Sequence, residues 1–131
     1  MDPSKNAALI ERYVDAYNAF DIDGMIAPLH EEVAFRNTSD GVVTHETKGV
    51  AAFRAQAAEG TRILSARKQT ITGMLPLTDD ADPGMAVEID YRAVLARDLP
   101  NGMKAGDTIE LTGRSEFRFR DGKIISIVDR S

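Results

Sequence analysis

The stretch from Thr108 to Arg120 alternates between two kinds of side chain, and this alternation constrains the fold more than any other feature of the sequence. Aromatic and aliphatic residues share one side of the stretch, whereas threonine, glutamate and arginine share the other. Successive side chains of a β-strand point to opposite faces of a sheet, so the pattern predicts a strand with one buried and one solvated face. Asp121-Gly122 follows directly and is a strong signal for a tight hairpin into a last strand over 124–129.

Strand patterns also account for the chain between Gly60 and this hairpin. Residues 63–74 and 85–96 are predicted to be strands, the second with clear alternation over 85–91, and turn-forming residues separate them from each other and from the next strand. Short connections join antiparallel neighbours, so these long strands predict an antiparallel arrangement. An earlier short strand is expected over 33–38, followed by a loop that continues to residue 48.

The first third of the chain has helical spacing instead. Apolar residues recur three and four positions apart between Leu9 and Phe20, which predicts an amphipathic helix that Asp2 can cap. Asp21 can cap a short second helix, which Pro28 limits to about two turns.

A third helix is expected from about Lys48 to Glu59, with Gly60 ending it. Helices that precede a run of long strands are typical of an α+β fold, with the helices on one face of the sheet. No repeat and no boundary interrupts the chain, so we expect one domain over residues 1–131.

Composition excludes several classes of function. The formal net charge is −5, whereas nucleic-acid-binding domains carry a clustered basic surface, so no nucleic-acid partner is expected. The chain has no cysteine, which excludes disulfides and cysteine–zinc sites, and His30 and His45 lack further ligands at metal spacing. There is no signal-peptide pattern and no apolar run near the ~18 residues of a membrane span. We therefore expect a cytoplasmic protein that has no contact with membranes and binds no metal.

Two segments resemble the NTF2-like superfamily. The first is Arg12-Tyr13-Val14-Asp15-Ala16-Tyr17-Asn18-Ala19 with the following Asp21-Ile22-Asp23-Gly24-Met25, and the second is Phe117-Arg118-Phe119-Arg120-Asp121-Gly122-Lys123-Ile124. With the order of the expected elements, they are similar to the SnoaL-like polyketide cyclase, ketosteroid isomerase and limonene-epoxide hydrolase branches. The resemblance implies a cone, in which a curved mixed or antiparallel sheet wraps around three N-terminal helices and admits a small hydrophobic ligand. Because a pocket reduces the core of a domain of this size, we also expect a homodimer.

Ketosteroid isomerases use three groups on this cone. A tyrosine of the first helix and a protonated aspartic acid donate hydrogen bonds to the developing enolate oxygen, and a first-strand aspartate moves the proton. Tyr13 matches the tyrosine, but the base position falls on Asn37 and the second donor position on Ser115. An amide cannot accept a proton at neutral pH, so ordinary ketosteroid isomerase activity is not expected.

Limonene-epoxide hydrolases use a different set on the same cone. A tyrosine and an asparagine of the first strand and an aspartate of the last strand position and deprotonate water. Phe35 stands in place of the tyrosine, whereas Asn37 and Asp129 match. Arg92 is the expected counterpart of an arginine that binds the epoxide oxygen, but the acid position two residues later is occupied by Val94.

The segment around Arg92 allows two interpretations. In the first, Arg92 faces the pocket, and a bulge could turn Asp90 inward as the missing acid. In the second, Arg92 is a solvated strand residue that pairs with Asp90 or Glu110. The alternation of the sequence does not decide between them.

SnoaL-like cyclases, by the resemblance, need a carboxylate in an apolar pocket and donors for an enolate, with no metal or organic cofactor. Asp129 is the expected acid and base, with Asn37 and Tyr13 as its polar partners. Burial beside Ile127 and Phe119 would raise the pKa of Asp129 toward neutrality, which suits proton transfer. The residues expected to bind the substrate are Tyr17, Phe35, Arg92, Ser115, Phe117 and Ile127.

The sequence therefore favours cofactor-independent acid–base chemistry on a small hydrophobic carbonyl or epoxide compound. A non-catalytic protein that binds a small hydrophobic ligand is the alternative, and the missing acids favour it. Purely structural roles are also open for three of the site residues. Tyr13 can pack in the core, Asn37 can bond the following turn, and Asp129 can lie exposed at a strand end.

Overall fold

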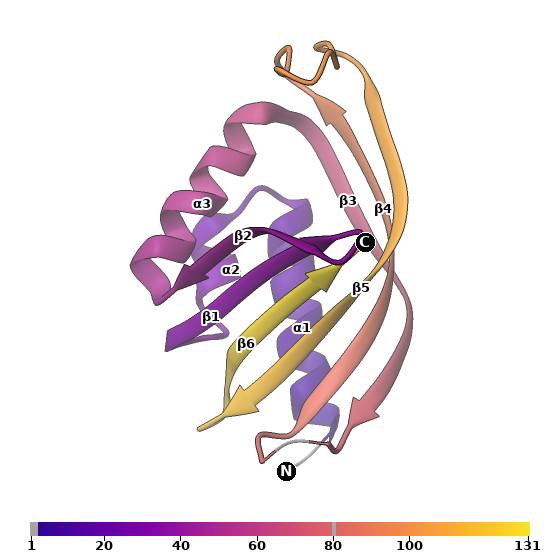
Figure 1. The fold of residues 1–131 in the computed structure, drawn as a ribbon. Coiled ribbons are helices and arrows are strands. Elements are labelled where there is room, and N and C mark those ends of the chain that lie inside the picture. Colours follow the sequence, from indigo (N-terminus) through magenta and orange to yellow (C-terminus); the bar gives the residue numbers. More distant parts are fainter. Residues whose placement is uncertain (1–2, 80) are drawn as a thin grey trace.

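The computed structural model describes residues 3–79 and 81–131. Its helices are α1 (Pro3–Asn18), α2 (Ile22–Ile26) and α3 (Val50–Ile63). Its strands are β1 (Leu29–Ser39), β2 (Val42–Lys48), β3 (Leu64–Leu77), β4 (Gly84–Leu95), β5 (Thr108–Arg120) and β6 (Lys123–Arg130). The strands form one six-stranded sheet, so the fold is α+β, as the patterns predict (Figure 1).

The sheet is mixed and has the strand order β2-β1-β6-β5-β4-β3. β1 runs parallel to β6, whereas the other neighbouring strands are antiparallel. The predicted hairpin joins β5 to β6, and Asp121 and Gly122 both have positive φ, as its turn type requires. The parallel pair brings an early strand beside the last one, so that Asn37 lies opposite Asp129.

The helices lie against the concave face of the curved sheet. The long strands β3, β4 and β5 bend around α1, and α3 lies beside β1 and β2 (Figure 1). Buried side chains from the helices and from this inner face form one core, which includes Ile10, Phe53, Phe117 and Phe119. None of the helices in the described part of the chain is both long and apolar enough to span a membrane.

The segment 42–48, which we expected to be a loop, is the edge strand β2. It pairs with β1, and Thr47 lies opposite Phe35. Almost all of its residues are exposed, so neither face is buried and the sequence lacks the alternation that indicates a strand. The loop prediction is wrong because pairing with the β1 backbone, rather than side-chain burial, forms this strand.

The third helix also differs from the prediction. It covers Val50–Ile63 rather than 48–59. It begins after Gly49, whose φ of 86° favours glycine and whose N–H donates a 2.7 Å hydrogen bond to the Val33 carbonyl. Gly60 lies inside the helix instead of ending it, because a glycine destabilises a helix interior by only about 1 kcal/mol.

The ends of the first two helices follow local chemistry. Asp21 caps α2 as expected, and its Oδ1 accepts a 3.0 Å hydrogen bond from the Gly24 N–H. α1 ends at Asn18, and Phe20 then takes a left-handed backbone conformation with φ 58°. The cap expected at Asp2 lies outside the described residues.

Candidate functional site

The strand register brings three of the expected site residues into one row on the inner face of the sheet. Asn37 of β1 is the partner of Asp129 of β6, and Asp129 is the partner of Ser115 of β5. Directly opposite residues on neighbouring strands point to the same face. The adjacent inner row, two positions along each strand, is buried and consists of Phe35, Ile127 and Phe117. Six residues predicted from the sequence therefore lie together.

One of the two carboxylate oxygens of Asp129 accepts a side-chain hydrogen bond, and the other is available to a ligand. The Ser115 hydroxyl donates a 2.7 Å hydrogen bond to its Oδ1. Within the described residues, no donor bonds its Oδ2. Burial raises the pKa of Asp129 from 3.8 to about 6, and the Ser115 hydrogen bond opposes that rise. The pKa moves in the direction expected from the sequence, and a carboxyl that titrates there can both accept and return a proton near neutral pH.

Tyr13 of α1 points to the same region of the core. Its ring lies edge-on to Phe117 at a centroid distance of 5.9 Å and packs at 6.3 Å from Phe53. Burial raises the pKa of Tyr13, and the negative charge of Asp129 raises it further. Tyr13 is therefore a neutral phenol that can donate a hydrogen bond near the carboxyl.

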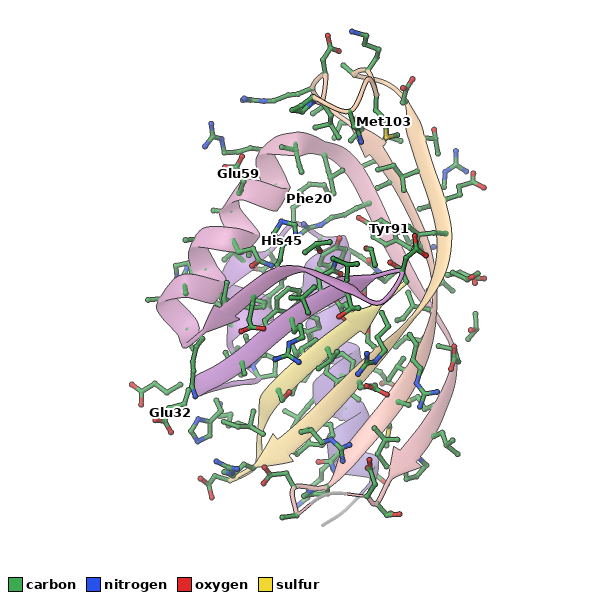
Figure 2. All side chains as sticks on the ribbon, viewed as in Figure 1. Phe20, Glu32, His45, Glu59, Tyr91 and Met103 are labelled. Atoms are coloured by element: carbon green, nitrogen blue, oxygen red, sulfur yellow. The ribbon has the colours of Figure 1, made fainter. Side chains whose placement is uncertain are left out.

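Asn37 lies beside Asp129, but its amide bonds in the other direction. Its Nδ2 donates a 2.7 Å hydrogen bond to the Thr44 hydroxyl, and that hydroxyl donates back to the Asn37 carbonyl at 3.3 Å. His45 Nδ1 lies 3.2 Å from the same hydroxyl, and its side chain is labelled in Figure 2. No hydrogen bond joins the side chains of Asn37 and Asp129, so the amide is tied to β2 rather than to the carboxyl.

The structure does not bring Arg92 to this group. Its side chain lies on the outer face, where Nε is 3.9 Å from Oε1 of Glu110. The pairing of β4 with β5 is regular throughout, so Asp90 also faces outward and is exposed. The interpretation of Arg92 as a solvated strand residue paired with Glu110 is confirmed, and this segment supplies no acid to the site.

A second polar group lies beside the C-terminal end of α1, and the sequence analysis found only one of its members. The hydroxyl of Tyr17, an expected site residue, is 2.8 Å from that of Tyr91. Arg67 Nε donates a 2.7 Å hydrogen bond to the Tyr17 carbonyl, and its guanidinium carbon lies over the Tyr17 ring at 3.8 Å and over the Phe20 ring at 4.4 Å. Phe20 and Tyr91 both lie between α3 and the long strands (Figure 2). The missed signal was an arginine at an inward-facing strand position.

Two hollows lie on the outer face of the sheet. The larger, about 530 Å³, is bordered by Lys68, Asp90 and Glu110 among others, and the smaller, about 300 Å³, by Glu88 and Arg114. Neither lies between the helices and the sheet, so the ligand pocket expected there stays a prediction. In residues 3–79 and 81–131, no three histidine, aspartate or glutamate side chains gather closely enough to hold a metal ion.

Comparisons with known proteins agree with this architecture. The family of SnoaL-like domains matches residues 10–127, which is most of the chain. No curated protein matches this chain.

Several solved structures share the fold. A candidate polyketide cyclase from Silicibacter sp. is 30% identical, with a TM-score of 0.71, and the match covers 94% of this chain and 85% of that one. A second candidate polyketide cyclase, from Xanthomonas campestris, is 24% identical with a TM-score of 0.75, over 98% and 90% of the two chains. A candidate aromatic ring hydroxylase from Novosphingobium aromaticivorans is 18% identical with a TM-score of 0.78, over 98% and 87%. The last two resemblances show the fold alone.

Proposed function

The chain belongs to the family of SnoaL-like domains, and from that premise we propose that it catalyses cofactor-independent proton transfer on a small hydrophobic carbonyl compound. One observation carries the proposal. Asp129 lies on the inner face of the sheet with Oδ1 bonded to Ser115 and Oδ2 available, and burial raises its pKa to about 6. The name of one similar structure, the candidate polyketide cyclase that is 30% identical, supports this chemistry at the level of the family.

The proposed step begins with the ionised form of Asp129. Its free oxygen takes a proton from the carbon next to the carbonyl, and the electron pair of that C–H bond moves toward the carbonyl oxygen to give an enolate. The enolate carbon then either attacks a second carbonyl of the same substrate, which forms a ring and an alkoxide that takes the proton from Asp129, or the enolate takes that proton back at another carbon. Tyr13 would donate a hydrogen bond to the developing oxygen charge, and Asn37 would limit the substrate's position on the β1 side.

Carbonyl chemistry fits the site better than epoxide opening. Opening an epoxide requires an acid that protonates the leaving oxygen, in addition to the base that activates water. Asp90 and Arg92, the candidates for that role, lie on the outer face. Proton abstraction beside a carbonyl needs one carboxyl and a hydrogen-bond donor, which Asp129 and Tyr13 would supply.

The test is deuterium exchange at the acidic carbon positions of β-tetralone, an apolar bicyclic ketone, followed by proton NMR in deuterated buffer. The wild-type chain should accelerate the exchange over buffer, and Asp129→Asn should remove the acceleration. Asp15→Asn is the matched control, because Asp15 is exposed on α1. Acceleration that survives in Asp129→Asn would remove Asp129 from the mechanism.

A second candidate function is non-catalytic binding of a small hydrophobic ligand. The bonding of Asn37 favours it, because the first-strand position that holds a base in ketosteroid isomerases here holds an amide bonded to Thr44. This candidate predicts that the wild-type chain binds β-tetralone without accelerating its exchange, and that Asp129→Asn binds it equally well.

A further inference from the structure

Tyr17 and Tyr91 place two phenol hydroxyls against each other beside the C-terminal end of α1. Their oxygens are 2.8 Å apart, and no other side chain in the described part of the molecule bonds either one. Both side chains are half-buried. Leu111, directly opposite Tyr91 on β5, is 41% exposed on the same face. The pair therefore lies where the inner face is open to solvent and to a ligand.

The two hydroxyls carry two hydrogens, and only one of these hydrogens is used in the bond between them. Only one hydrogen can lie between two hydroxyl oxygens, and either tyrosine can supply it. The tyrosine that accepts keeps its own hydrogen, for which residues 3–79 and 81–131 offer no acceptor. Polar groups at partly buried positions normally have a partner, which here is water or, in its place, an oxygen of a ligand.

Arg67 lies beneath Tyr17 and adds a positive charge. It is 7% exposed, and its guanidinium carbon is 3.8 Å from the centre of the Tyr17 ring. Within the described residues, no carboxylate oxygen lies within the 4.0 Å of an ion pair with it. Burial raises the pKa of Tyr17 and of Tyr91, and the charge of Arg67 opposes the rise at both. A buried cation without a counter-ion favours negative charge nearby and strengthens the hydroxyl donor.

We propose that Tyr17, Tyr91 and Arg67 form a subsite for an ionised enol or phenol oxygen of the ligand. The inference rests on the proposed function and deepens it, because it makes the substrate an apolar ring compound with a second, ionised oxygen away from the reacting carbon. Tyr17 and Tyr91 contact that oxygen. Arg67 is a positioning residue that acts through the ring and main chain of Tyr17.

The strand register sets the length of such a ligand. Ser115, which bonds Asp129, pairs with Val87 on β4, and Tyr91 lies farther along the same strand. The separation from Val87 to Tyr91 is roughly 13 Å at the rise of a β-strand. The side chains of Asp129 and Tyr91 extend from the backbone, so a ligand of two or more rings can contact the carboxyl and the tyrosine pair together.

The test uses lawsone, a hydroxynaphthoquinone whose enol is ionised at neutral pH, and its neutral methyl ether. Isothermal titration calorimetry of the wild-type chain should show about tenfold tighter binding of lawsone. The double variant Tyr17→Phe/Tyr91→Phe keeps both rings but removes both hydroxyls, so it should bind both compounds equally, with the affinity for the ether within about twofold of wild type. Equal affinities in the wild type, or a preference that survives in this double variant, would overturn the proposal.

Variants of Arg67 test the role of its charge. Arg67→Gln should lose the preference for lawsone, and Arg67→Lys should recover part of it. Lys68→Gln is the matched control, because it removes the neighbouring positive charge from the outer face of β3 and should leave the preference unchanged. Far-UV circular dichroism checks folding, and the double variant Tyr17→Phe/Tyr91→Phe tests the subsite independently if Arg67→Gln does not fold.

Asp129→Asn separates this inference from the proposed function. It should abolish deuterium exchange yet keep or increase the preference for lawsone, because it also removes a negative charge from the same face. A preference that depends on the two hydroxyls, without any exchange in the wild type, would refute the catalytic proposal and leave the subsite. Exchange without a preference for lawsone would refute the subsite alone.

Discussion

The hydroxyl of Ser115 donates a 2.7 Å hydrogen bond to the carboxylate of Asp129 across the β5–β6 pair. Two opposing effects therefore act on one carboxyl. Burial disfavours its charged form and raises its pKa, whereas the hydrogen bond favours the charged form and lowers it. Burial prevails, and the pKa rests at about 6. Substitution of Ser115 removes the hydrogen bond, and substitution of Asp129 removes the buried charge.

Ser115→Ala should raise the pKa of Asp129 above its present value. The hydroxyl stabilises the ionised carboxyl, and a hydrogen bond to a charged group contributes about 1.5–3 kcal/mol, so the rise should be about one unit or more. The measurement is a pH titration of the Asp129 carboxyl carbon by NMR. Ser126→Ala, on the same strand pair but opposite Arg118, is the control and should leave that pKa unchanged. An unshifted pKa in Ser115→Ala would show that the hydrogen bond is absent in solution.

Asp129→Asn should stabilise the protein relative to the wild type at neutral pH but not at pH 4. The folded-state pKa of Asp129 is raised above its unfolded value of 3.8, so the folded state binds more protons between about pH 4 and 6, and stability contributed by the neutral acid is lost as the pH rises through that window. The loss is at most about 3 kcal/mol, at 1.36 kcal/mol per pKa unit.

The measurement is the free energy of urea-induced unfolding of both chains at pH 4 and pH 7. The variant should be equally stable at the lower pH and more stable at the higher one. Asp79 and Asp82, whose pKa values arginine hydrogen bonds lower, act in the opposite direction, but they are common to both chains and cancel in the difference. A difference that does not change with pH would mean that Asp129 titrates alike in the folded and unfolded chain.

The row around Asp129 could be predicted because strand alternation is a local property. Once β5 and β6 are recognised, the same two-residue period that buries Phe117 and Ile127 places Ser115 and Asp129 on the inner face. The position of Asn37 beside them required the resemblance to a known cone, since a parallel pairing of β1 with β6 leaves no local signal.

The tyrosine pair could not be predicted in the same way. Tyr17, Arg67 and Tyr91 come from three elements far apart in the sequence, and their contact depends on the curvature of the sheet around α1. The face of Arg92 was ambiguous for a related reason, because a single bulge would reverse it and the sequence does not show whether one is present.

Asn18→Ala should destabilise the fold by about 1–3 kcal/mol, because it leaves two backbone groups of Gln69 without their partner. The Asn18 side chain donates a 3.0 Å hydrogen bond to the Gln69 carbonyl and accepts a 2.7 Å hydrogen bond from its N–H. β3 is an edge strand, so the amide takes the place of a neighbouring strand there. The measurements are urea-induced unfolding and hydrogen exchange of the Gln69 amide, which should become faster.

Asn101→Ala is the control for this change, because the Asn101 side chain bonds only the nearby Met103 N–H in an exposed loop. It should change the stability by well under the Asn18→Ala effect and leave the Gln69 amide protected. A Gln69 amide that exchanges equally slowly in Asn18→Ala would contradict the role assigned to Asn18.

Phe20 should show an inverted preference between alanine and glycine. Its φ of 58° is left-handed, a conformation that is unfavourable by roughly 1–2 kcal/mol for a residue with a Cβ atom but readily accessible to glycine. Both Phe20→Ala and Phe20→Gly also remove the ring that lies 4.4 Å from the Arg67 guanidinium, so both should be less stable than a chain that keeps this contact without the strain. The difference between the two variants measures the strain of the left-handed backbone, and Phe20→Gly should exceed Phe20→Ala in stability by about 1 kcal/mol.

At Asp15, inside the right-handed α1, the same two substitutions should give the opposite order, with alanine the more stable. The same order at both positions would mean that the ring of Phe20 is not held over Arg67 by a left-handed backbone, and the support of Tyr17 by that arginine would need a different explanation.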